Sequence, residues 1–348
     1  MKRVHSDIVQ FRGSHYDFGQ MQGELLKKSV ILANRQKQRT ASSRHLIIDE
    51  QRAKNILQTL APRVWEEING LADALNWSLH DAIREFGGYY LEYTRSGCSI
   101  YTESDFMVRN YDSSPQGYEG RLALYQPTDG GFATIGPTMQ ITGRTDGMNE
   151  KGLVMGYNFI NRRNSEDGFI CNMIGRLILE NCATIDDAVE LLEELPHRRS
   201  FSYVLLDRTG RSVVVEASPR FVVVRDSAVS TNHFELLVEE NRYQIDDSRR
   251  REDAMLKQQQ NKIDAYSAFR LLNDSNQGVF STKYSTASGT LHTASYFPHS
   301  LEIGFAIGPD RLPLMLDFDK WLQGERLYAK RINGNIDTHF PFAHMAEL

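Results

Sequence analysis

The pattern of hydrophobic and polar positions changes character once along the chain, close to residue 98. Before this point, apolar residues recur at intervals of three and four, a spacing that places them on one face of a helix. These positions are Phe18, Met21, Leu25, Leu26, Ile56, Leu57, Leu60, Val64 and Ile68. A capping sequence at 78–81 begins one more helix, which Gly87 ends or bends. Residues 15–97 are therefore predicted to be helical.

Strand patterns dominate after residue 97, and they begin with a predicted hairpin. Residues 98–103 and 106–111 are separated only by the short polar turn Ser104-Asp105. The hairpin would carry Cys98 where its first strand begins and Asp112 where its second strand ends. The two residues would therefore lie near the same end of the hairpin.

The rest of the chain alternates hairpin-linked strands with helices. Strands are predicted at 133–135, 139–142, 153–158, 202–206, 212–216, 221–224, 290–296 and 301–307. Helices are predicted at 170–178, 184–195 and 266–272, and the C-terminal tail is helix-prone. Because hairpin connections are too short for the crossovers that parallel strands need, we expect an α+β fold of layered antiparallel sheets.

Composition narrows the class of protein. With 348 residues, of which 41% are hydrophobic and 24% charged, the chain can bury a substantial core. The net charge of -5, with basic residues dispersed among acidic ones, offers no basic face for nucleic acid. No apolar run approaches the length of a membrane span, and no apolar segment follows the basic N-terminus. These features predict a cytoplasmic protein that binds neither nucleic acid nor membrane.

The three cysteines form no CxxC pair and leave an odd count, which argues against a disulfide framework or a zinc site. Cys171 and Cys182 lie in helical, apolar stretches and are predicted to be core residues. Cys98 taken alone would also be a buried hydrophobe, the commonest role of a free cysteine. Its setting favours a nucleophile, because Arg109 and Asp112 on the paired strand would supply charge and orientation.

Two asparagines are candidates for an oxyanion hole. Asn158 follows a predicted strand, and Asn232 lies in the segment 230–234. One side-chain amide donor in such a site can contribute about 3 kcal/mol to catalysis, although each asparagine alone is more often a turn or cap residue. The histidines, including His233 and His292, are interpreted as core or surface residues, and no GxSxG, GxGxxG or HExxH motif is present.

Four segments in order resemble one protein family. They are 11–23, 97–99 with 109–112, 146–158, and 231–234. The first resembles an opening Gly-x-x-Tyr-x-x-Gly segment, the second a nucleophile and its following Arg-Asn-aromatic-Asp, the third a Gly-Met-Asn strand, and the fourth a Thr-Asn-His segment. Together they resemble the acyl-coenzyme A:6-aminopenicillanic acid acyltransferase family, which is similar to choloylglycine hydrolases and penicillin V acylases of the N-terminal nucleophile superfamily.

This resemblance implies a four-layer αββα sandwich, synthesised as a precursor that cleaves itself between Gly97 and Cys98. Residues 1–97 would be a helical N-terminal segment, either released as a propeptide or kept as a small subunit, and 98–348 would form the αββα domain. Retention by self-association of the two fragments is favoured, because the apolar face of the helical segment needs burial.

The resemblance also implies a role for each candidate. The Cys98 thiol would be the nucleophile, and its newly freed α-amine, with an ordinary pKa of about 7.7–8.0, would be the general base. Asp112 would orient that amine, and Arg109 would lower the pKa of the thiol. Asn232 and Asn158 would stabilise the oxyanion.

Tyr157 and Ser295 are the predicted substrate-binding residues. Ser295 would correspond to a serine of the acyltransferases, whereas the C-terminal arginine of choloylglycine hydrolases has no counterpart in 290–296. The expected substrate is a small N-acyl amide or acyl thioester, and the scheme needs no metal or organic cofactor.

Three function classes stay open. A hydrolase of linear amides comes first, an acyl-coenzyme A-dependent N-acyltransferase second, and an unprocessed, non-catalytic binder of an acyl ligand third. The sequence does not decide whether the protein forms a homo-oligomer.

Overall fold

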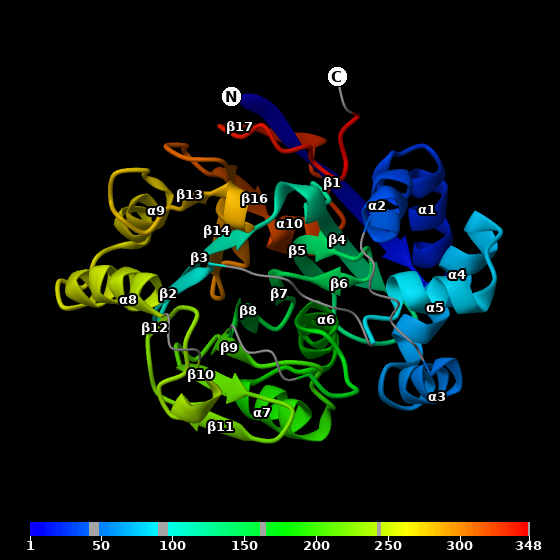
Figure 1. The fold of residues 1–348 in the computed structure, drawn as a ribbon, viewed down its shortest axis with the longest axis horizontal. Helices are drawn as coiled ribbons and strands as arrows, with labels where there is room; N and C mark the ends of the chain where they lie inside the picture. The colour runs from blue at the N-terminus through cyan, green and yellow to red at the C-terminus, as the bar shows by residue number, and fades with distance from the viewer. Residues whose placement is uncertain (42–48, 90–96, 161–164, 242–244, 347–348) are drawn as a thin grey trace.

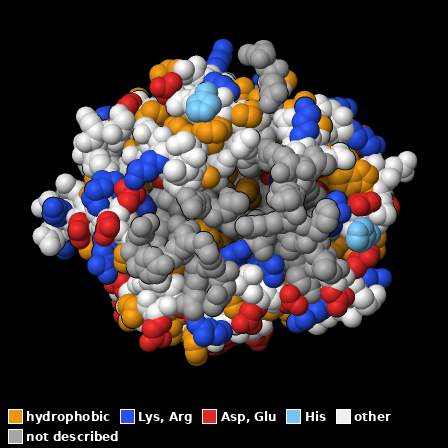
Figure 2. All heavy atoms as spheres, viewed as in Figure 1, with side chains coloured by type: hydrophobic (Ala, Val, Ile, Leu, Met, Phe, Trp, Pro, Cys, Tyr) orange, Lys and Arg blue, Asp and Glu red, His pale blue; other side chains and the backbone are white. Residues whose placement is uncertain are grey.

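The structure is a computed structural model that describes residues 1–41, 49–89, 97–160, 165–241 and 245–346. These residues form two β-sheets that pack face to face, with helices on both outer sides (Figure 1). No helix in the described ranges combines the length and the apolar character needed to cross a bilayer. On the face drawn in Figure 2, acidic and basic side chains lie interspersed.

The larger sheet contains ten strands within the described residues. In pairing order they are β11 (Val222–Arg225), β10 (Ser212–Ala217), β9 (Phe201–Leu206), β8 (Val154–Phe159), β7 (Asp146–Asn149), β5 (Thr134–Met139), β4 (Arg121–Pro127), β1 (Lys2–Gly13) and β17 (Arg331–Ile336), with β6 (Gly143–Arg144) paired to β5. All neighbours are antiparallel except β1 and β4, which pair in parallel.

The smaller sheet contains seven strands in the same described part of the chain. In pairing order they are β12 (Val229–Ser230), β2 (Ser99–Glu103), β3 (Phe106–Ser113), β14 (Ser288–Phe297), β15 (Glu302–Ile307) and β16 (Leu314–Asp317), with β13 (Thr282–Lys283) paired to β14. The predicted hairpin is confirmed: β2 and β3 pair antiparallel, with Ser99 opposite Asn110.

Helices cover both outer faces of the sheet pair. They are α1 (His15–Lys27), α2 (Ile31–Ala41), α3 (Glu50–Leu60), α4 (Pro62–Leu75), α5 (Leu79–Phe86), α6 (Cys171–Asn181), α7 (Ile185–Glu194), α8 (Asp246–Gln259), α9 (Ala265–Asn273) and α10 (Phe318–Leu322). Three single 3-10 turns lie at Pro115–Gly117, Val238–Glu240 and Tyr284–Thr286. In Figure 1, α8 and α9 lie beside β2 and β3, on the opposite side of the molecule from α1–α5.

Three buried apolar clusters separate the layers. One packs α4, α6 and α7 against the larger sheet and includes Met155 and Ile178. The second fills the space between the sheets and includes Ile100 and Val154. The third packs α8 and α9 against the smaller sheet through residues such as Val108. This order of helix, sheet, sheet and helix confirms the predicted four-layer αββα sandwich.

The structure corrects three predicted elements: the helical segment 1–97, the helix-prone tail and the strand 139–142. The segment 1–97 is not wholly helical, because β1 is a strand of the larger sheet. The tail contains β16 and β17 and only the short helix α10, and the period-two pattern of Arg331–Ile336 is what a half-buried strand requires. Residues 140–142 form a turn instead of continuing a strand. Helix α8 has no counterpart among the predicted helices, because its polar sequence carries no clear apolar stripe.

Gly19 in the first motif and Gly70 on α4 allow two helices of the N-terminal segment to touch. A Cβ atom on Gly19 would lie 2.0 Å from the carbonyl oxygen of Glu67, and one on Gly70 would lie 2.1 Å from that of Tyr16. Any larger residue at these positions would force α1 and α4 apart. The segment 11–23 thus contributes to the packing of α1 against α4.

Candidate active site

Cys98 lies directly before β2 and is fully buried. Its sulfur accepts a hydrogen bond from the backbone N–H of Asp112 at 3.3 Å. A second donor, Nη2 of Arg109, lies 3.7 Å from the same sulfur. Donors aimed at sulfur favour the thiolate, which is the nucleophilic form of cysteine.

Arg109 reaches Cys98 from the adjacent strand β3 and is itself fully buried. Its Nη2 also donates to the carbonyl oxygen of Tyr157 at 2.7 Å, and its Nη1 forms an ion pair with Asp146. Burial alone would lower the pKa of Arg109, but the carboxylate of Asp146 raises it above its usual value. The guanidinium is therefore a fixed positive charge beside the thiol.

Gly156 on β8 makes room for Arg109 to cross between the sheets. A Cβ atom at this position would lie 2.9 Å from Cδ of Arg109 and 2.9 Å from Cδ1 of Ile100. Contacts this short would displace the arginine side chain. The absence of a side chain at Gly156 is thus part of what positions Arg109.

Asp112 ends the same hairpin, and its carboxylate lies beside the backbone of Gly97. A Cβ atom built on Gly97 would stand 3.2 Å from Oδ2 of Asp112. Burial raises the pKa of Asp112 to about 7, although the positive charge of Arg251 opposes the rise. The structure therefore brings a carboxyl group with a near-neutral pKa next to the residues that flank the predicted cleavage bond.

Asn232 is held on three sides. Its backbone N–H donates to Oγ of Ser248 at 2.7 Å, and its side-chain Nδ2 donates to the carbonyl oxygen of Phe159 at 2.9 Å. Its Oδ1 accepts a hydrogen bond from Nη2 of Arg251 at 2.9 Å. Because the guanidinium can only donate and the carbonyl can only accept, the amide has one favourable orientation.

Arg251 on α8 is absent from the residues predicted from the sequence, yet it joins the two halves of the site. Its Nη1 donates to the carbonyl oxygen of Cys98 at 2.8 Å and to Oγ of Ser99 at 2.6 Å, while Nη2 holds Asn232. One guanidinium thus fixes the candidate nucleophile and a candidate oxyanion donor together. The available signal was helical spacing, since Arg251 shares the buried face of α8 with Ser248 and Met255.

Asn158 lies on β8, on the same face of the strand as Gly156 by strand alternation. Its Nδ2 donates to Oγ of Ser230 at 3.0 Å, and Ser230 pairs with Ile100 of β2. Its buried Oδ1 has no hydrogen-bond partner among the described residues. Asn158 is therefore linked through Ser230 of β12 to β2, the strand that begins after Cys98.

The two predicted substrate-binding residues differ in position. Tyr157 contacts Arg109 through its carbonyl oxygen and through its ring, whose centre lies 4.9 Å from the guanidinium carbon. Ser295 pairs with Val108, which faces α8 and α9, whereas Arg109 faces the space between the sheets. The structure therefore does not bring Ser295 together with Cys98, because side chains alternate between the two faces of a strand.

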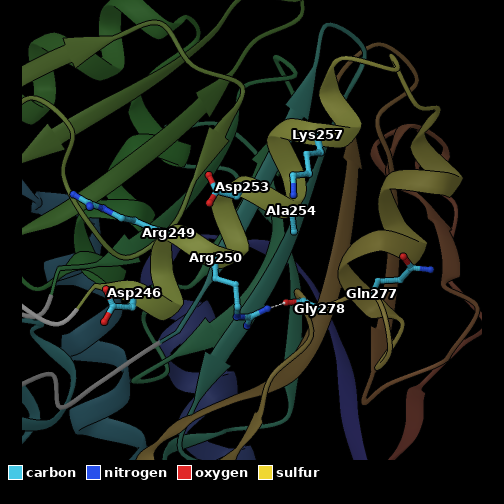
Figure 3. A pocket seen from close by; sticks show the side chains of 8 residues that line it. All are labelled: Asp246, Arg249, Arg250, Asp253, Ala254, Lys257, Gln277 and Gly278. Atoms are coloured by element: carbon cyan, nitrogen blue, oxygen red, sulfur yellow. Dashed lines mark hydrogen bonds between the residues drawn. The ribbon is translucent and has the colours of Figure 1, made fainter.

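The outer side of α8 lines a shallow groove that is separate from these contacts. This space of about 460 Å³ is lined by eight residues, which include Arg250, Asp253 and Lys257 of α8 and the loop residues Gln277 and Gly278 (Figure 3). The spacing of three and four between these α8 residues places them away from the buried face of α8. In the described part of the chain, no group of three or more His, Cys, Asp or Glu side chains is arranged to hold a metal ion.

Three solved structures are similar to this chain at low sequence identity. Penicillin V acylase from Agrobacterium tumefaciens is 15% identical with a TM-score of 0.44, and the match covers 64% of this chain and 86% of that one. A mutant of conjugated bile acid hydrolase from Clostridium perfringens is 17% identical with a TM-score of 0.45, covering 69% and 97%. A Caenorhabditis elegans ortholog of N-acylethanolamine-hydrolyzing acid amidase is 13% identical with a TM-score of 0.40, covering 58% and 93%.

No curated protein matches the sequence. The family model of acyl-coenzyme A:6-aminopenicillanic acid acyl-transferases matches residues 101–311, which is more than half of the chain. This span includes strands of both sheets and the residues Arg109, Asp112, Asn158 and Asn232. The chain belongs to the acyl-coenzyme A:6-aminopenicillanic acid acyl-transferase family.

Proposed function

We propose that this protein is an amidohydrolase that uses Cys98 as an N-terminal nucleophile and cleaves linear N-acyl amides through a thioester acyl-enzyme. The observation that carries the proposal is the set of contacts at the thiol. The sulfur of Cys98 receives a hydrogen bond from the Asp112 N–H, faces Nη2 of Arg109, and lies one residue from a Gly97 backbone that the Asp112 carboxylate approaches.

The first step is self-cleavage. The sulfur of Cys98 attacks the carbonyl carbon of Gly97, the Gly97–Cys98 C–N bond breaks, and the nitrogen leaves as the α-amine of Cys98 after accepting the thiol proton. The resulting thioester is hydrolysed by water, which leaves a carboxylate on Gly97 and restores the thiol. Asp112 lies where it can bind the new ammonium group.

The second step is amide turnover by Cys98 as the new N-terminal residue. The α-amine of Cys98 accepts the thiol proton, and the thiolate attacks the substrate carbonyl carbon. Asn232 and Asn158 donate hydrogen bonds to the oxyanion, and the amine product leaves with a proton. Water then hydrolyses the thioester, which releases the acyl group as a carboxylate. Arg109 favours the thiolate throughout.

We propose further that residues 1–97 remain bound to 98–348 as a small subunit after cleavage. Strand β1 pairs with both β4 and β17 in the larger sheet, which supports retention. A buried polar seam adds to it: Arg176 forms an ion pair with Glu67 at 2.7 Å, and His15 contacts Glu180 at 3.2 Å. Release of the segment would break both of these contacts and would remove β1 from its place between β4 and β17.

The second candidate function is acyl transfer from an acyl-coenzyme A thioester to an amine. Membership of the acyl-coenzyme A:6-aminopenicillanic acid acyl-transferase family favours it. The two reactions share the acyl-enzyme and differ only in whether water or an amine accepts the acyl group. Hydrolysis ranks first because it needs no second substrate site.

Intact-mass spectrometry of the purified protein tests the cleavage, and a turnover assay tests the nucleophile. The wild-type protein is expected to give two fragments that meet at Gly97 and Cys98, whereas Cys98→Ser is expected to lose amide turnover. Turnover is measured on N-acyl amino acids, penicillin V and bile salts, with and without an acyl-coenzyme A donor.

Cys182→Ser is the matched control, because Cys182 is buried but belongs to the cluster on the helical side of the larger sheet. This variant should be cleaved and active like the wild-type protein. An uncut, inactive wild-type chain, or full activity in Cys98→Ser, would refute the proposal. Acyl transfer that exceeds hydrolysis would reverse the ranking of the two functions.

A further inference from the structure

Asp146 contacts Arg109 through Nη1, whereas the thiol of Cys98 faces the other terminal nitrogen, Nη2. It belongs to β7 of the larger sheet, whereas Arg109 belongs to β3 of the smaller one. Both side chains are fully buried, and Nη1 of Arg109 forms an ion pair with Oδ1 of Asp146. The pair therefore bridges the two sheets through their shared apolar core.

Two hydroxyl groups also donate to the carboxylate of Asp146. The hydroxyl of Tyr296 donates to Oδ2 at 2.6 Å, and the hydroxyl of Thr145 donates to Oδ1 at 2.6 Å. Nε2 of His292 lies 3.5 Å from Oδ1. Burial by itself would raise the pKa of Asp146, but the charge of Arg109 lowers it below its usual range. The carboxylate is thus a fixed anion with a fixed orientation.

This arrangement constrains the arginine. Because the guanidinium is planar, its Nη1 contact with Asp146 restricts the direction of Nη2. In this orientation Nη2 faces the Tyr157 carbonyl oxygen and the Cys98 sulfur. The family-like segment 146–158 thus holds Arg109 by a carboxylate at its start and by a backbone carbonyl near its end.

We infer that Asp146 is a positioning residue, which holds the Arg109 guanidinium in the orientation that presents Nη2 to the Cys98 sulfur. The inference rests on the proposed function, since it takes Cys98 as the nucleophile. Loss of this anchor should let Nη2 of Arg109 turn away from the sulfur, so the thiolate would lose a donor that favours it and the geometry of attack would be lost.

The test compares Asp146→Asn with wild-type protein by two measurements. The rate of Cys98 alkylation by iodoacetamide is followed against pH at the level of the Cys98 peptide, and kcat and KM are measured on the best amide substrate. The midpoint of the alkylation profile is expected to move to higher pH, because the thiolate loses the Arg109 donor, while kcat falls roughly tenfold or more and KM changes little. A move to lower pH would show that Asp146 acts through its charge alone and would overturn the inference. A residue that only stabilises the fold would leave the alkylation midpoint in place.

A milder variant keeps the inference testable when Asp146→Asn does not fold. Tyr296→Phe removes one hydrogen bond to Asp146 and keeps the ion pair, so kcat should fall about two- to tenfold. Thr293→Val is the matched control: it removes a buried hydroxyl from the same strand, where Thr293 donates to Asn110 Oδ1 at 2.8 Å and does not contact Asp146. An unmoved midpoint, or equal effects of Tyr296→Phe and Thr293→Val, would overturn the inference. Activity that survives Cys98→Ser would instead overturn the proposed function.

Discussion

Substitution of Arg251 by lysine tests whether one guanidinium couples the two halves of the site. The arginine makes separate contacts through Nη1, to Cys98 and Ser99, and through Nη2, to Asn232. A lysine ammonium is a single point on a flexible stem and cannot occupy both positions. The variant keeps a positive charge beside Asp112 but loses the two separate donor nitrogens of the guanidinium.

The magnitude follows from the contacts. Loss of one charge-assisted hydrogen bond costs about 1.5–3 kcal/mol. The contact to Asn232 fixes a candidate oxyanion donor, so this cost falls on the transition state. At about 1.4 kcal/mol for each factor of ten, kcat should fall about 10- to 150-fold. KM should change much less, because Arg251 contacts the protein's own backbone and side chains.

The assay is steady-state amide hydrolysis, with thermal unfolding measured in parallel. Arg249→Lys is the matched control, because Arg249 lies two residues away on α8 and is exposed. An Arg251→Lys variant with wild-type kcat, or a loss of kcat equal to that in Arg249→Lys, would refute the coupling. A lower Tm without a lower kcat would assign Arg251 to stability alone.

Three further changes have defined outcomes. Because burial raises the pKa of Asp112 above its unfolded value, the wild-type protein loses stability as pH rises from about 4 to about 7. Asp112→Asn should therefore gain in Tm relative to wild type over that range and stay level above it. His15→Gln should behave differently: burial lowers the pKa of His15, but Glu180 raises it overall, so its contribution is present below pH 6.5 and fades as pH rises through the folded pKa. The Tm deficit of this variant should thus be larger at pH 6 than at pH 9. Gly156→Ala should cost about 1–3 kcal/mol of stability and reduce kcat, because its Cβ would displace Arg109.

Each of these changes has a measurement that would contradict it. A Tm difference for Asp112→Asn that does not vary with pH would show that the carboxyl group ionises normally. A Tm deficit of His15→Gln that stays constant across pH would show that protonated His15 does not stabilise the buried polar seam. Gly117→Ala is the control for Gly156→Ala, since a Cβ there would meet only Met139 at 3.8 Å, and equal losses in both would contradict the argument from close contact.

The sheet regions and the hairpin can be predicted from the sequence because their signals are local. Alternation and a two-residue turn are sufficient for β2 and β3, and Cys98 and Asp112 follow from the same hairpin. Helix α8 could not be predicted in this way, because most of its residues are charged or polar and its buried face shows only a few apolar positions. Arg251 is missed for the same reason, since its helical spacing with Ser248 and Met255 marks it as the buried arginine of three only when α8 is recognised as a helix.

The place of β1 in the sheet and the position of Ser295 are harder to predict from the sequence, for a different reason. The N-terminal strand carries few apolar residues, and its place in the sheet depends on β4 and β17, which lie far along the chain. Ser295 follows from resemblance alone, whereas its side of the sheet depends on the register of β14, which contains an irregularity between Thr290 and His292. One residue of register decides which face a side chain occupies.

The pairing of β1 with β17 has a consequence for how the molecule is made. Lys2 lies opposite Ile336, so the first strand to leave the ribosome has no partner along this edge until the last strand, β17, has been made. Contacts between such distant segments form late, because the loop between them must close first. During synthesis, β1 is therefore a sheet edge without its final neighbour, and a chain that stops before Arg331 would leave that edge open to pairing with other molecules. The last strand of this protein thus protects the first from aggregation.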